Sequence, residues 1–115
     1  MIGSRRRGQP PPPWVVWEAL TTPNRDPRRV WLIPHRGEVP PRVIEADRPH
    51  LVVWSSLWTN RPGYVIRFDL EPAGQGTSLR WTLLAPDEPA PEVVGGLRWR
   101  MNELINARLR YSFGQ

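Results

Sequence analysis

The last quarter of the chain constrains the fold most. Residues 92–111 place apolar side chains three and four positions apart, which is typical of a helix with one buried face. The stretch between Pro41 and Pro86 is instead typical of short strands separated by turns. A strand-rich chain that closes with one long amphipathic helix predicts a curved sheet holding a helix. The space between them is either a cavity or a solid core.

The composition excludes several classes of function. A chain of 115 residues is long enough for one domain. It has no Cys, which excludes disulfides and Cys-based redox or metal chemistry. Its two His residues stand alone beside prolines, so we expect no metal and no cofactor. It lacks a secretory signal and an apolar run of about 18 residues, so we expect a cytoplasmic protein without membrane insertion.

The charge is strongly positive but scattered. The net charge is +5, and all 16 basic residues are Arg, which we attribute to a GC-rich genome. Arg5, Arg6 and Arg7 lie among Gly, Ser and Pro, so we predict that residues 1–11 form a flexible basic and Pro-rich tail. No recognition motif accompanies the charge, and we therefore predict no nucleic-acid partner.

Local patterns predict the remaining elements. Two short helices are expected near the N-terminus, one over residues 14–20 and one beginning at Asp26–Pro27. Strands are expected over residues 42–46, 50–58, 64–70 and 77–85, because apolar and β-branched residues alternate there between turn signals. The last two alternate most cleanly and predict an antiparallel hairpin with one buried face.

Three segments, in this order, resemble START-like (SRPBCC) proteins, which include polyketide cyclases and activators of a chaperone ATPase. They are Pro-Pro-Trp-Val-Val-Trp-Glu-Ala-Leu-Thr-Thr-Pro at 12–23, the strand pair at 42–54, and the Phe-x-Leu-x-Pro to Gly-Thr-x-Leu hairpin at 68–79. The resemblance implies an α+β helix-grip fold in residues 12–115. An antiparallel sheet of about four to six strands would wrap around the C-terminal helix, with two short helices near the N-terminus. Members mostly hold hydrophobic small molecules between sheet and helix.

The chain departs from the family in being short. The first strand of the family would have to lie at residues 3–9, where three arginines fit a buried strand poorly. A shortened sheet leaves unpaired backbone groups at its edge, and we therefore expect a homodimer.

The inner face of the predicted hairpin should meet the apolar face of the helix. The functional interpretation is a ligand cavity, and the alternative, which we favour slightly for so small a domain, is a close-packed core. The candidate ligand-binding residues are Trp54, Trp58, Tyr64, Ile66, Phe68, Trp81, Leu97, Met101, Leu104 and Ile105.

Candidate catalytic residues are few. Glu45 lies between apolar neighbours on a predicted strand, and Arg108 falls on the predicted buried stripe of the helix, so either could serve a cyclase or hold an acidic ligand. The alternative, which we favour, places Glu45 on the outer face of the sheet and the Arg108 head group in water.

Three functions remain open from the sequence. The leading one is a domain that binds a small hydrophobic ligand without catalysis. The second is an enzyme of cyclase or dehydratase type that uses Glu45 or Arg108. The third is a protein-interaction module with a filled core, a dimer or a cochaperone-like domain, that uses Trp14, Trp31 or Trp99.

Overall fold

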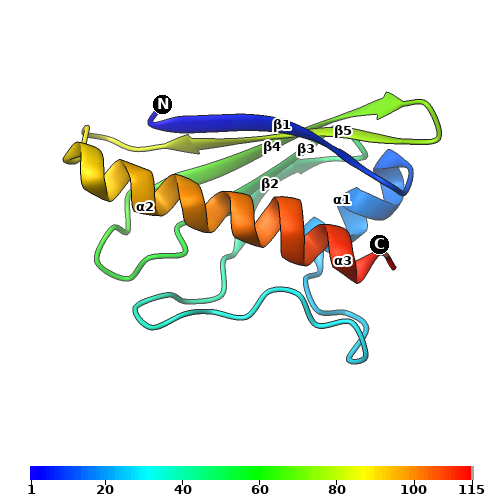
Figure 1. Ribbon diagram of the computed structural model, residues 1–115, viewed down its shortest axis with the longest axis horizontal. Coiled ribbons are helices and arrows are strands. Elements are labelled where there is room, and N and C mark those ends of the chain that lie inside the picture. Colours follow the sequence, from blue (N-terminus) through cyan, green and yellow to red (C-terminus); the bar gives the residue numbers. More distant parts are fainter. Residues whose placement is uncertain (115) are drawn as a thin grey trace.

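A five-stranded antiparallel sheet and one long C-terminal helix make up the protein (Figure 1). The computed structural model describes residues 1–114, so Gln115, the last residue of the predicted domain 12–115, lies outside the described residues. The strand order is β1-β5-β4-β3-β2. The elements are β1 (Gly3–Gln9), α1 (Pro13–Thr21), β2 (Val43–Asp47), β3 (Leu51–Ser55), β4 (Val65–Ala73), β5 (Gly76–Leu84), α2 (Pro91–Met101), η1 (Asn102–Leu109) and α3 (Arg110–Ser112).

Strands β4 and β5 form the predicted hairpin with one buried face. Phe68 stands opposite Trp81 in the antiparallel register, and both side chains are fully buried. The neighbouring Arg67 is exposed on the other face, as the period of two requires. Gly74 closes the turn with a φ of 60°, a left-handed conformation that glycine adopts without strain.

Strands β2 and β3 also lie where the sequence predicts strands, with β3 shorter than expected. It ends at Ser55, and Trp58 joins only an isolated bridge to Glu38. Strand β2 is exposed along its whole length, and its pairing with β3 shifts between Val43 and Glu45. It forms one edge of the sheet.

The first residues are not the flexible tail that we predicted. Gly3–Gln9 forms β1, the other edge strand, paired with β5 over its whole length. Arg5 and Arg7 stand opposite Trp81 and Leu79, so they share the inner face of the sheet, yet both arginines are exposed. An edge strand allows this, because long side chains can leave the sheet sideways into water.

The predicted second helix at Asp26–Pro27 does not form. Asp26 Oδ1 accepts the Arg28 N–H in a local turn that goes no further. Asn24 organises the loop instead: its φ is 62°, its Oδ1 accepts the N–H groups of Trp31 and Leu32, and its Nδ2 donates to Leu32 O. These contacts bend the chain back and leave α1 as the one short N-terminal helix of the described chain.

The C-terminal helix keeps the predicted buried face, except at its end. The fully buried Met101, Leu104 and Ile105 lie on that face, but Leu109 continues the stripe and Arg108 is exposed. The reason is that η1 is π-helical, with more residues in each turn than an α-helix. Residues five positions apart share a face of such a helix, so Leu109 lies on the same face as Leu104 and Arg108 turns to solvent.

The fold is α+β with a helix gripped by a curved antiparallel sheet, as expected, and its five strands fall within the predicted range. The core lies between the inner face of the sheet and the helix, with α1 closing one end. Within residues 1–114, we find no helix whose length and apolar character would suffice to cross a membrane.

Candidate functional site

The ten predicted ligand-binding residues lie together in one buried cluster between sheet and helix. Each exposes less than a tenth of its surface, and seven of them expose none. Of the ten, only Trp58 borders any of five well-defined surface pockets of residues 1–114. The interior is therefore close to the solid-core alternative, and a ligand contact at these residues stays a prediction.

An aromatic row crosses this core toward the surface. Trp31 stacks on Trp54 with ring centroids 6.1 Å apart, and Trp54 meets Phe68 edge to face at 4.7 Å. The Trp54 indole N–H donates to Leu20 O at 2.8 Å, which fixes the ring against α1. Trp31, predicted as a surface anchor, is buried at 4% exposure. It is the outermost ring of the row.

The two predicted catalytic residues are both exposed and belong to different parts of the fold. Glu45 lies on the edge strand β2. Arg108 projects from η1 with its side chain 58% exposed, and its Nε donates to Glu103 at 3.0 Å. Neither residue has a buried, shaped surrounding that would prepare it for proton transfer, so the enzyme hypothesis loses its two residues.

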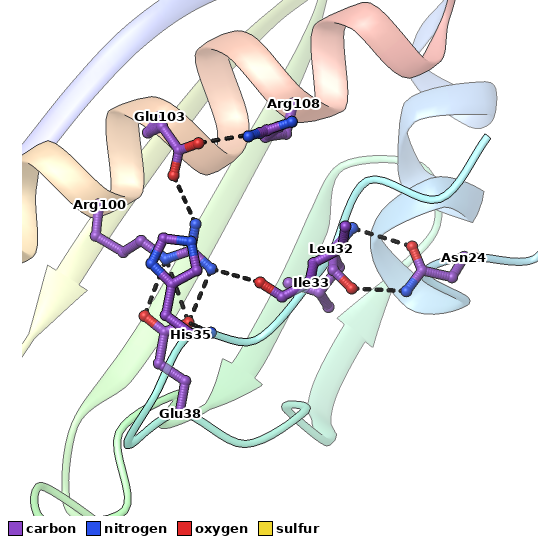
Figure 2. A network of polar contacts seen from close by, with 8 residues as sticks. All are labelled: Asn24, Leu32, Ile33, His35, Glu38, Arg100, Glu103 and Arg108. Atoms are coloured by element: carbon purple, nitrogen blue, oxygen red, sulfur yellow. Dashed lines mark hydrogen bonds and ion pairs between the residues drawn. The ribbon is translucent and has the colours of Figure 1, made fainter.

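The structure instead buries a charge pair that the sequence reasoning missed (Figure 2). The Arg100 and Glu38 side chains are 7% and 6% exposed. Arg100 donates from Nε and Nη2 to the Glu38 carboxylate, from Nη2 to Ile33 O at 2.8 Å, and from Nη1 to Glu103 at 2.6 Å. The Glu38 carboxylate also accepts the His35 N–H at 2.8 Å.

Opposing effects act on the ionisation of this cluster. Burial favours a higher pKa for the Glu38 carboxyl, but hydrogen bonds from Arg100 and His35 and the Arg100 charge hold that pKa below its ordinary value. Burial likewise acts to lower the pKa of Arg100, and its hydrogen bonds with Glu38 and Glu103 raise it instead. Both groups are thus held in their charged forms.

The Arg100 cluster is suited to holding the fold together and not to proton transfer. A charged guanidinium with its donors engaged and a carboxylate of lowered pKa are poorly suited to accept or release a proton near pH 7. What they do is fasten the loop carrying Ile33, His35 and Glu38 to the C-terminal helix. The sequence contained a sign that Arg100 would be buried. Arg100 follows Leu97 by three positions and precedes Leu104 by four, which places it on the apolar face of the helix.

A hollow beside Trp31 is the best-defined pocket. It has a volume of about 210 Å³ and mainly apolar walls, and it opens to solvent. Val15 and Ala19 of α1 form one side and Phe113 after α3 the other, while Trp31 contributes to the lining. The hollow therefore lies where α1 and the end of the C-terminal helix meet, near the C-terminal end of the chain in Figure 1.

The rim of this pocket carries one cation without a carboxylate. Arg25 pairs with Glu18 at 3.6 Å. Arg29 donates to Ser112 O at 3.2 Å and has no ion pair among residues 1–114. The Asp26 carboxylate also lines the pocket and is near enough for the Arg29 charge to help lower its pKa. Because Arg29 has no direct ion pair, its guanidinium can still meet an anionic group.

The remaining sequence candidates lie elsewhere. Trp14 and Trp99 are exposed at 52% and 64%, on α1 and α2. Among residues 1–114 no group of three or more His, Cys, Asp and Glu side chains could hold a metal ion.

Several solved structures have the same fold as this chain. Protein MLL2253 from Mesorhizobium loti superposes with a TM-score of 0.72 at 19% identity over 97% of this chain and 96% of its own. CalU16 from Micromonospora echinospora gives 0.68 at 19% identity over 91% and 70%, and the Aha1 dimer from Colwellia psychrerythraea gives 0.67 at 17% over 93% and 91%. The chain has the START-like fold. In sequence, this chain matches no family model and no curated protein.

Proposed function

We propose that this START-like domain binds a small, mainly apolar carboxylic acid in the pocket between α1 and the end of the C-terminal helix. The observation that carries the proposal is that apolar walls lie beside Arg29, a cation at the rim that forms no direct ion pair with residues 1–114. Apolar walls with a few placed polar groups are the usual make-up of a ligand site. The acid group would meet Arg29, and the apolar body would lie against Val15, Ala19 and Trp31.

The volume limits the size of the ligand. A cavity of about 150 Å³ holds benzene, so about 210 Å³ suits one ring or a short alkyl chain with its acid group. Sites for drug-sized molecules start near about 300 Å³. A larger ligand would have to displace the Trp31 ring, behind which lie Trp54, Phe68 and the rest of the predicted ligand-binding set.

Binding is favoured over catalysis. Glu45 and Arg108 are exposed. The buried Arg100 and Glu38 form an ion pair with each other, so neither is free to act on a ligand. The rim carries two arginines and two carboxylates. Hydrogen bonds from Arg28 lower the pKa of the Asp26 carboxyl, so it stays ionised and is poorly suited to general acid or base catalysis near pH 7.

Filling the pocket tests its use. We expect 3-phenylpropanoate, titrated by isothermal calorimetry or ligand-observed NMR, to bind the wild type and to lose at least about tenfold in affinity in Ala19→Trp, because the new ring occupies the apolar walls. Ala73→Trp adds the same ring at the exposed end of β4 and should bind as the wild type does. Equal affinity in all three proteins would rule out this pocket.

The role of Arg29 is tested separately. Arg29→Gln should weaken 3-phenylpropanoate by about tenfold but leave the neutral 3-phenylpropanamide unchanged, since only the acid uses the charge. A loss of both ligands to the same degree would mean that Arg29 acts through the shape of the pocket and not through its charge.

A further inference from the structure

Four arginines follow the junction between the edge strand β1 and the C-terminal helix. We define Arg5, Arg7, Arg98 and Arg110 as the arginine seam. The strand and the helix run side by side in Figure 1, and three contacts tie them together: Gly3 lies against the Arg98 stem, Gln9 Nε2 donates to Ile105 O at 3.1 Å, and Arg110 donates to Gly8 O.

The placement of the seam follows from two periodicities. On β1, residues 3, 5, 7 and 9 share the inner face, because their partners on β5 belong to that face. On the helix, positions 98, 102, 106 and 110 follow at intervals of four. The two ends of this row contact β1, Arg98 at Gly3 and Arg110 at Gly8. Gly3 makes the close approach possible, since a Cβ there would stand 2.8 Å from Arg98 Cγ. The helical part of the seam runs from Arg98 on α2 to Arg110 at the start of α3.

The seam is positive without local compensation. None of its four guanidinium groups forms an ion pair with a carboxylate of residues 1–114, whereas Arg6, Arg67 and Arg100 elsewhere do. Between the arginines lie Asn102 and Asn106. Two buried acceptors here, Gln9 Oε1 and Asn106 Oδ1, have no hydrogen-bond donor. The two amide oxygens are buried and need donors, so they say nothing about an anion. The line of unpaired arginines by itself favours an anionic occupant.

Backbone geometry indicates the form of that occupant. Strand β1 has a strand neighbour on one side only, so about half of its N–H and C=O groups face outward. An extended peptide can pair with such an edge, and alternate side chains of the peptide then face the same side as Arg5 and Arg7. A second β1 cannot do so favourably, because its arginines would oppose these.

We propose that β1 and the arginine seam bind an extended acidic segment of a partner protein as a sixth strand of the sheet. Nucleic acid is the weaker alternative, since its phosphates can accept from the free N–H groups of the edge but offer no regular row of donors to the free C=O groups. The other edge of this chain is not the ligand, because Glu45 and Asp47 on β2 are flanked by Arg42 and Arg48. This proposal is independent of the pocket at Arg29.

The experiment uses a fluorescein-labelled octapeptide of alternating Glu and Val, measured by anisotropy against the full chain. We expect binding that weakens with salt between about 50 and 300 mM and that falls at least about tenfold in the double variant Arg5→Glu, Arg7→Glu. The matched control is Arg36→Glu, Arg42→Glu, which changes the net charge equally at exposed arginines without ion pairs to residues 1–114 and should bind as the wild type does.

Two further probes separate strand addition from simple charge attraction. An alternating Glu and Pro octapeptide carries the same charge but cannot pair with an edge, so it should bind weakly. In ¹⁵N spectra, the Glu and Val peptide should shift the amides of Gly3–Gln9. Equal binding of both peptides, tighter binding of single-stranded DNA of similar length, or unchanged binding in the Arg5, Arg7 variant would each overturn the proposal. Failure of the pocket ligand to bind would leave it unaffected.

Discussion

At the scale of single residues, the decisive difference lies between two arginines of the same helix. Arg100 is buried and pairs with Glu38, while Arg108 is exposed and pairs with Glu103. Exposed ion pairs contribute about 0–1 kcal/mol, whereas removal of one partner from a buried pair leaves a charge without compensation and costs about 3–5 kcal/mol. Within this cluster, we therefore expect the Arg100–Glu38 pair to affect the free energy of unfolding most.

Glu38→Gln should lower the free energy of unfolding at pH 7 by about 1–3 kcal/mol, measured by urea denaturation, because the buried Arg100 then keeps only Glu103 as a counter-charge. The double variant Glu38→Leu, Arg100→Met serves as control and should recover most of the loss, since apolar groups of similar volume replace both charges. A loss below about 0.5 kcal/mol in Glu38→Gln would show that the pair behaves as a surface pair.

The stabilisation by Glu38 should depend on pH in a defined direction. Its pKa is lower in the folded protein than in the unfolded chain, where a glutamate has a pKa of about 4.3. The contribution is therefore complete above about pH 5 and is lost as the pH falls through the lower folded value. Unfolding measured at pH 7, 5 and 3 should show the wild type approaching Glu38→Gln at pH 3. A difference that stays constant over this range would contradict the assignment.

At the scale of elements, the π-helical turn decides which side chains the C-terminal helix buries. Leu109 is fully buried, and Arg108 turns outward. Leu109→Ala should cost about 2–5 kcal/mol of unfolding free energy, as for other large-to-small core changes. Arg108→Ala should cost less than about 1 kcal/mol. An α-helical register would reverse this order, so a larger cost for Arg108→Ala would contradict the observed helix.

These elements also show how far the sequence could be interpreted. The β4–β5 hairpin and the Leu97 to Ile105 face of the helix were predictable, because local periodicity alone decides which side is buried. Strand β1 was not, since its three arginines are tolerated only because it lies at an edge, and an edge is a property of the whole sheet. The Asn24 loop likewise depends on side-chain hydrogen bonds to residues seven and eight positions away.

The candidate site was less predictable than the fold. The aromatic rings were expected to line a cavity, but the sequence does not say how closely they pack. The pocket beside Trp31 arises where α1, the Asn24 loop and the chain end meet, and no single segment signals it. Glu38 and Arg100 are 62 residues apart in the sequence and meet only after the loop has folded over the helix.

At the scale of the whole molecule, the two sheet edges differ in their capacity for self-association. The charge of β1 opposes pairing with a second copy, whereas β2 exposes Val43 and Ile44 along an open edge. The expected homodimer, if it uses the sheet, should therefore form through β2. Sedimentation should detect a dimer at high concentration that Ile44→Lys abolishes and Arg6→Glu does not. A wild-type monomer at millimolar concentration would remove the prediction.

The proposed ligand site can be tested most directly by locating the ligand in solution. Isotope-filtered NOE spectra of the ¹³C-labelled protein with unlabelled 3-phenylpropanoate report which side chains touch its ring. We expect cross-peaks to Val15, Ala19, Trp31 and Phe113, the walls of the pocket. Cross-peaks only to Ile66, Met101 and Leu104 would place the ligand between sheet and helix, and an absence of cross-peaks at saturating ligand would contradict the proposed function.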